Sequence, residues 1–233
     1  MELILDGISQ AFWLLWHRDP EVMEVVRLSL QVSGSATLIS LLIGVPYGTF
    51  LGLSRFPGRN LTISLVNTGM GMPPVVVGLF LSIMLWRSGP LGLLHLLYTP
   101  AAMVVAQVII ATPIITGVSM AAIAQLDPQL RLQMLGLGAS RVQLLWVILQ
   151  EARLPLLTGV MAGFGGVISE VGAVMMVGGN IKDQTRVLTT ATVMETNRGH
   201  FGTAIALGII LLMIAFLVNL ALTYLQQRGR LTR

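Results

Sequence analysis

The sequence predicts an all-α integral membrane protein with about five transmembrane helices. It also predicts an N-terminal interfacial helix and a short helical segment outside the membrane. Of its 233 residues, 55% are hydrophobic and 10% are charged, whereas a soluble domain carries about a quarter charged residues. The mean hydropathy is +0.83. So few charges cannot solvate the surface in water, and lipid satisfies no backbone hydrogen bond, so the spanning segments must be helices.

The first element, residues 1–25, is expected to be an interfacial helix that is retained. Its apolar run is too short to span, since a span needs about twenty residues. Trp13 and Trp16 are typical of a membrane interface. Glu2 and Asp6 stand where a signal peptide would carry positive charge.

The next elements are the apolar stretches that are long enough to span. They form one transmembrane domain over residues 26–227, with an extramembrane loop at about 125–153 and a tail at 228–233. No internal repeat or flexible linker divides this domain. The predicted spans are Val26–Leu53, Leu61–Trp86, Pro100–Ala124, Leu154–Val177 and Thr203–Leu225.

The distribution of arginine predicts the orientation of these spans. If the helices alternate, Arg55 and Arg59, the basic residues of the loop 125–153 and those of the tail fall on one side. An excess of basic residues marks the cytoplasmic side. The loop and the C-terminus are therefore expected in the cytoplasm, and the N-terminus outside.

The loop "LGLGASRVQLLWVILQEARLP" interrupts the apolar pattern with two short helices. Asp127 and Pro128 are suited to the cap and first position of one helix. Gly138 favours a turn, and Ser140 is suited to cap a second helix that leads into Pro155. The loop is either an amphipathic segment lying on the bilayer or a peg for a cytoplasmic partner.

This loop resembles the coupling loop of ABC importer permeases. Gly138-Ala139-Ser140 matches a Gly-Ala-Ser commonly found there, and Leu154-Pro155 matches a Leu-Pro. The usual acidic-Ala-Ala is replaced, so Leu132 cannot make the usual acidic contact to the ATPase, and the gap between Gly138 and Leu154 is longer than the consensus. The resemblance implies that the ATPase contacts Leu132, Gln133, Met134, Gly138, Ala139 and Ser140.

Two further segments carry the resemblance, which covers about the last two hundred residues. "NTGMGMPPVVVGLFL" resembles permeases for tetrahedral oxyanions, and "SEVGAVMMVGGNI" resembles molybdate-type permeases, most closely the tungstate branch. The resemblance implies a type I importer permease of the inner (cytoplasmic) membrane that forms a homodimer. Its implied partners are an ATP-binding subunit and an extracytoplasmic substrate-binding protein. Tungstate is the first expected cargo, then molybdate, then sulfate.

The candidate pathway residues lie in these two segments. Pro73 and Pro74 must interrupt a helix, either to line a cavity or as a packing kink. Glu170 is the one acid deep inside an apolar span, where a charge costs roughly 2.5 kcal/mol or more. It is interpreted as a gate or as a structural acid bonded to backbone or to a neighbouring helix. The pathway or gate candidates are Pro73, Pro74, Glu170, Gly172 and Asn180.

Glycines at intervals of four predict close helix packing, within the subunit or across a dimer. They line one face of a helix and let another backbone approach. The glycines are Gly44, Gly48 and Gly52 in the first span and Gly159 and Gly163 in the fourth.

Several functions are excluded. There is no cysteine, and the three histidines are dispersed, so no metal site, cofactor or catalytic residue is predicted. Lys182, the single lysine, has no P-loop context, so ATP hydrolysis requires another polypeptide. Basic and aromatic residues are not interleaved, which argues against nucleic-acid binding. An intramembrane hydrolase would need a nucleophile and a base within the spans, and a channel or scaffold leaves the glycine-centred loop unexplained.

Overall fold

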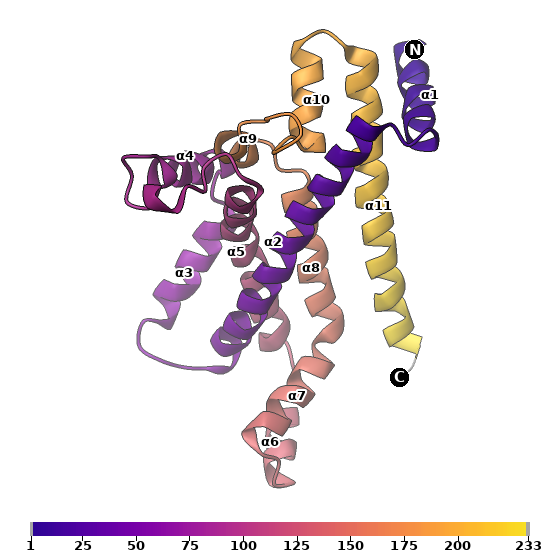
Figure 1. Ribbon diagram of the computed structural model, residues 1–233. Coiled ribbons are helices and arrows are strands. Elements are labelled where there is room, and N and C mark those ends of the chain that lie inside the picture. The colour runs from indigo at the N-terminus through magenta and orange to yellow at the C-terminus, as the bar shows by residue number, and fades with distance from the viewer. Residues whose placement is uncertain (1, 232–233) are drawn as a thin grey trace.

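The computed structural model describes the backbone of residues 2–231 and the side chains of residues 5–227. This part of the chain is helical and contains no strand (Figure 1). The predicted all-α class is confirmed. The helices are α1 Glu2–Trp16, α2 Pro20–Leu53, α3 Arg59–Met70, α4 Pro74–Leu85, η1 Gly92–Leu94, α5 Pro100–Ala124, α6 Pro128–Gly136, α7 Arg141–Glu151, α8 Arg153–Ile168, α9 Gly172–Gly178, α10 Leu188–Asn197 and α11 Phe201–Leu231.

Three described helices are long and apolar enough to cross a membrane singly: α2, α5 and α11. The number rises to as many as 5 if two bent pairs each count as one span: α3 with α4, and α7 with α8. The first span begins earlier than predicted. Asp19 accepts a hydrogen bond from the Val22 amide at 3.1 Å, and Pro20 starts α2 instead of Val26.

Two predicted spans are not single helices: the interruption expected at Pro73 and Pro74 is present, whereas the one in Leu154–Val177 was not predicted. Leu61–Trp86 is divided between α3 and α4, which are bent by 98° around the segment Gly71–Pro73. Pro74 has no amide hydrogen to continue the helix, and proline disfavours helical backbone in the residue before it. Leu154–Val177 is also divided, because the helix stops at Ile168 and restarts at Gly172.

The centre of the fold is α5, which packs between α2 and α8. The glycine faces make this approach close. An added Cβ at Gly48 would lie 2.5 Å from the Thr116 carbonyl oxygen of α5, and one at Gly44 would lie 2.9 Å from Ile115. Gly52 faces Ile123 of the same helix. From the other side, Gly163 faces Ile115 at 2.9 Å and Gly159 faces Val118 at 3.2 Å.

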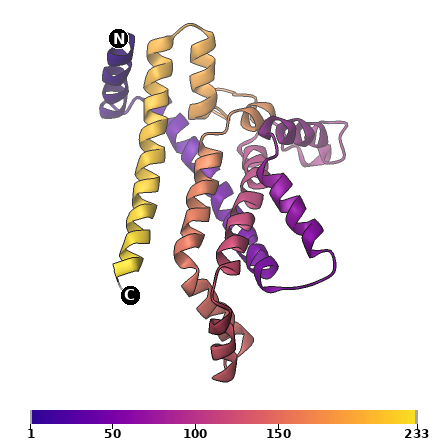
Figure 2. The same ribbon diagram turned by 180° about the vertical axis from the view of Figure 1, so that it is seen from behind.

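The two ends of the chain form a separate layer. Both views show α1 running beside the upper half of α11 (Figures 1 and 2). Ala11 and Leu14 of α1 share a buried apolar cluster with Leu207 and Ile210 of α11. The predicted tail mostly continues α11 to Leu231, and residues 232–233 lie outside the described residues.

Much of α11 has no covering within the chain. In its most apolar window only 17% of the residues are buried, against 50% for α5. A helix this apolar requires lipid or another subunit around it.

Candidate coupling surface and transport pathway

The α6–α7 hairpin, residues 127–151, projects from the lower end of the molecule (Figure 1). Asp127 caps α6 by accepting from the Gln129 amide at 2.9 Å. Gly138 makes the turn with φ +79, a conformation that only glycine adopts at low cost. Ser140 then opens α7 with a capping box: its hydroxyl accepts from the Gln143 amide at 3.3 Å, and its own amide donates to the Gln143 side chain at 2.8 Å.

A small apolar cluster fixes the hairpin to the helices above it. Leu144 and Ile148 of α7 are buried against Ile123, at the end of α5, and Ala152. Met134 of α6 packs at the edge of the same cluster, as do residues from the ends of α2 and α8. The hairpin is therefore packed directly on the helical core.

The rest of the hairpin is apolar and exposed. No residue of α6 is buried. Leu132, Val142 and Leu137 are 69%, 77% and 82% exposed. A hollow of about 550 Å³ between the two helices is lined by Met134, Gly138, Ala139 and Trp146, among others. Exposed apolar surface of this kind fits both interpretations of the loop, contact with the bilayer and contact with a partner protein.

The structure places the expected ATPase-contact residues on this hairpin. Leu132, Gln133, Gly138 and Ser140 are exposed, and Met134 and Ala139 are half-buried beside the hollow. Leu132 stands at the first of the three positions where the consensus has acidic-Ala-Ala. The side chain exposed there is therefore apolar.

The two interrupted spans meet each other. The first turn of α4, just after Pro73 and Pro74, lies against the first turn of α9. An added Cβ at Gly172 would lie 2.5 Å from the Val75 side chain. One at Gly78 would lie 2.7 Å from the Ala173 Cα. Paired breaks in membrane helices are a feature of transporter binding and gating regions, because irregular backbone is tolerated only where protein or a cavity surrounds it.

Glu170 occupies the second of these breaks. Its carboxylate accepts from the Ala173 amide at 3.0 Å and so caps the start of α9. Its carbonyl oxygen accepts from the Thr189 hydroxyl of α10 at 3.0 Å. Of the two interpretations of Glu170, these contacts favour the structural one, in which the acid bonds to backbone. Sequence reasoning missed Thr189, because nothing in the pattern links it to a residue 19 positions earlier.

Asn180 lies at the opposite end of α9 from Glu170 and Gly172. Its backbone is left-handed, with φ +51, and its side-chain Oδ1 is buried without a hydrogen-bond partner within the described chain. The turn around it is organised by Thr185, whose hydroxyl donates to the Gly178 carbonyl at 2.5 Å and accepts from the Ile181 amide at 3.0 Å. The candidate pathway residues thus form two groups, one at each end of α9.

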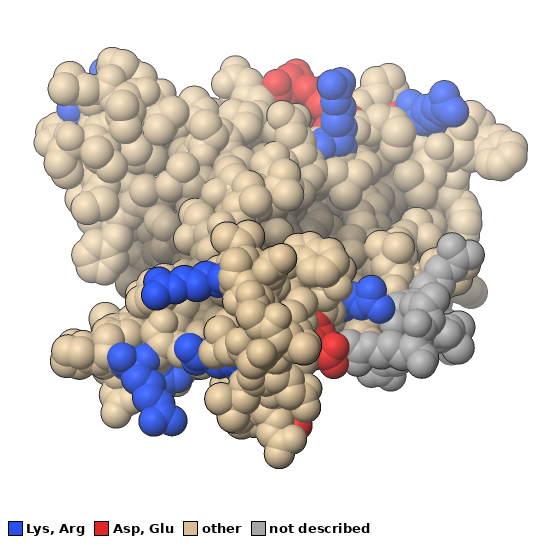
Figure 3. All heavy atoms as spheres, turned by 90° about the horizontal axis from the view of Figure 1, so that it is seen from below, with Lys and Arg blue, Asp and Glu red and all other residues tan. Residues whose placement is uncertain are grey.

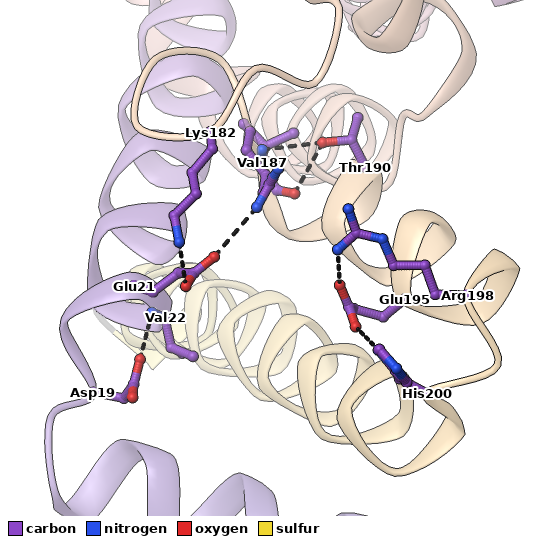
Figure 4. Close-up of polar contacts among 10 residues, drawn as sticks. Asp19, Glu21, Val22, Lys182, Val187, Thr190, Glu195, Arg198 and His200 are labelled. Atoms are coloured by element: carbon purple, nitrogen blue, oxygen red, sulfur yellow. Dashed lines mark hydrogen bonds and ion pairs between the residues drawn. The ribbon is translucent and has the colours of Figure 1, made fainter.

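Ion pairs on the upper face tie α2 to the loop after α9 (Figure 4). Glu21 binds Lys182 at 2.8 Å and Arg186 at 3.2 Å. The hydrogen bond to Glu21 raises the pKa of the Lys182 amine above its ordinary value. On α10, Glu195 holds Arg198 at 3.1 Å and His200 at 2.8 Å. No pattern in the sequence predicted these pairs.

This arrangement defines a class of protein: a helical membrane transport subunit with interrupted spans and an exposed apolar hairpin on one face. Its overall fold agrees with solved structures. A bacterial alginate ABC transporter matches with a TM-score of 0.78 at 17% identity, covering 95% of this chain and 86% of the other. The inward-facing MetNI methionine ABC transporter matches with a TM-score of 0.72 at 18% identity, covering 94% and 97%.

The chain belongs to the family described as binding-protein-dependent transport system inner membrane component, which matches residues 44–231. A tungstate uptake system permease protein of Peptoclostridium acidaminophilum is 40% identical, covering 97% of this chain and 100% of the relative. A probable anion ABC transporter permease protein of Haloferax volcanii is 39% identical, covering 85% and 88%. A molybdenum transport system permease protein of Escherichia coli K12 is 30% identical, covering 86% and 93%. The resemblance to importer permeases is confirmed.

Proposed function

We propose that this chain is the permease subunit of an ATP-driven importer that carries tungstate across the cytoplasmic membrane. The observation that carries this proposal is the 40% identity to a tungstate uptake permease over its whole length. A second tungstate uptake permease, from Campylobacter jejuni, is 36% identical over 94% of this chain. The chain itself is proposed to be non-catalytic.

The α6–α7 hairpin is the proposed contact with a separate ATP-binding subunit. Its exposed leucines and the hollow beside Gly138 present an apolar surface that a soluble partner would cover. Leu132 takes the place of the acidic residue that usually contacts the ATPase. Apolar packing of Leu132 on the ATP-binding subunit is therefore proposed to replace an ion pair. The contact should therefore be nearly insensitive to salt, since screening weakens charge pairs and leaves apolar burial intact.

The transport pathway is proposed to lie between two copies of the chain. A single copy leaves α11 and much of the apolar surface uncovered, and a two-fold dimer is the commonest closed assembly. The breaks at Pro73–Pro74 and Glu170–Gly172 would then line or gate the pathway. The upper face, with the 181–200 segment, is the proposed docking surface for a substrate-binding protein.

Reconstituted transport tests this function. The chain is placed in liposomes with its ATP-binding subunit and substrate-binding protein, and ATP-dependent accumulation of tungsten is measured by elemental mass spectrometry. Uptake should occur only with all three components. Added molybdate should reduce the accumulation of tungsten, and added sulfate should reduce it less. ATP-independent uptake would contradict the importer assignment.

Molybdate is the second candidate cargo, supported by the 30% identity to a molybdenum transport permease. Calorimetric titration of the substrate-binding protein with tungstate, molybdate and sulfate separates these candidates. A preference for molybdate would replace the cargo and leave the importer mechanism unchanged.

A further inference from the structure

A second hollow lies on the same face as the α6–α7 hairpin, between α6 and the ends of α2 and α5. Its volume is about 680 Å³. Most of its wall is apolar, with Leu53, Ile123 and Leu126 among the lining residues. Three arginines, Arg55, Arg59 and Arg131, also line it. The hollow thus combines an apolar wall with a group of basic side chains.

These arginines outnumber the acids of the lining three to one and give it a net positive charge. The ion pairs found in the described part of the chain do not involve them. The one acid of the lining, Asp127, is engaged as the cap of α6. Arg59 is held in place because its Nε donates to the Leu51 carbonyl at 2.9 Å. Arg55 and Arg131 are exposed. Figure 3 shows basic side chains gathered on this face beside the projecting hairpin.

The hollow lies where the spans end, at the level expected for lipid headgroups. Gly52 and Ile123, on its wall, belong to the last turns of α2 and α5. Nearby Phe50 and Leu61 are exposed apolar side chains that need hydrocarbon around them. The arginines therefore lie at a boundary where basic side chains reach from apolar surroundings toward phosphate.

We propose that this hollow binds an anionic phospholipid of the inner leaflet. Its phosphate would accept hydrogen bonds from the arginines, since guanidinium groups suit phosphate in charge and geometry. Its acyl chains would cover the exposed Leu135 and the half-buried Leu53 and Leu126 of the wall, which a free oxyanion would leave uncovered. Basic pockets between membrane helices on the cytoplasmic side are a known form of headgroup recognition. The inference goes beyond transport, because a lipid here would join the end of α2 to α6 and so hold the hairpin.

Native mass spectrometry of the full-length protein in detergent tests the proposal. The protein is titrated with phosphatidylglycerol and with phosphatidylcholine, and the affinity ratio is measured. Arg55→Gln and Arg131→Gln should each reduce the preference for phosphatidylglycerol roughly five-fold, and the double variant by their product. Neither side chain has an ion-pair partner in the described chain, so unfolding temperatures should stay near that of the unmodified protein.

Arg141→Gln is the matched control, because Arg141 is exposed on the same hairpin but does not line the hollow. It should leave the lipid preference unchanged. Equal affinity for the two lipids would overturn the proposal, as would an equal effect of Arg141→Gln. Displacement by glycerol phosphate as readily as by phosphatidylglycerol would identify a soluble-anion site instead. Loss of ATPase binding in the double variant, with lipid preference intact, would identify a protein contact instead.

Discussion

Replacing Gly48 by alanine should separate the two central helices. The added Cβ would lie 2.5 Å from the Thr116 carbonyl oxygen and 2.7 Å from the Ser119 Cβ. Ordinary contact begins at 3.4 Å, so α2 must retreat from α5 by about 0.9 Å (3.4 − 2.5). Neither obstacle can rotate away, because one is backbone and the other is a Cβ.

The cost follows from this geometry. Overpacking of a tight interface costs about 1–3 kcal/mol, partly offset by the roughly 0.5–1 kcal/mol gained when alanine replaces glycine in a helix. The net destabilisation should be about 0–2.5 kcal/mol, with a central value of about 1 kcal/mol. At about 2–4 °C per kcal/mol for a chain of this size, the unfolding temperature should fall by several degrees.

Gly34→Ala provides the matched control in the same helix. Nothing lies within 4 Å of a Cβ at Gly34, so only the gain in helix propensity remains and stability should rise slightly. The assay is thermal unfolding of both variants in one detergent, followed by circular dichroism. If Gly48→Ala is as stable as Gly34→Ala, the close approach of α2 and α5 is refuted.

Three further predictions concern the hairpin, the second break and the orientation. Gly138→Val should abolish ATPase binding while the protein remains in the membrane, because a β-branched residue is strained at φ +79. Gly136→Val is the control and should retain ATPase binding, because position 136 has open space and no positive φ. Pull-down of the ATPase by each variant compares the two. Glu170→Leu should lower stability by about 1–3 kcal/mol through an uncapped amide, whereas Glu170→Gln, which still accepts, should unfold close to the unmodified protein; equal melting of both would remove the capping role. The chain has no cysteine, so Ser140→Cys should react with an impermeant thiol reagent only in opened cells and Thr196→Cys also in intact cells. Labelling of position 140 from outside would contradict coupling to a cytoplasmic ATPase.

Local signals in the sequence predicted the hairpin correctly. Caps at Asp127 and Ser140 and the turn at Gly138 depend on residues within three positions of each other, so the pattern contains all the information needed. The resemblance of this loop and of two further segments to importer permeases also predicted the family correctly.

The interruption at Glu170 was not predicted, because apolar residues flank it on both sides and hydropathy registers no gap. What ends α8 there is a tertiary arrangement: α9 packs on α4, and Thr189 of α10 binds the freed carbonyl. The pairing of Glu21 with Lys182 spans 161 positions. One sequence holds no periodicity that links residues so far apart.

The glycine contacts and the apolar cluster under the α6–α7 hairpin together pack the hairpin tightly against the membrane-spanning helices. Ile123 of α5 touches both Gly52 of α2 and the buried face of α7. Close-packed interfaces of this kind do not deform gradually. We therefore expect a displacement of the hairpin to move the lower ends of α2, α5 and α8 together. This movement should be transmitted along these helices into the membrane-spanning part of the protein.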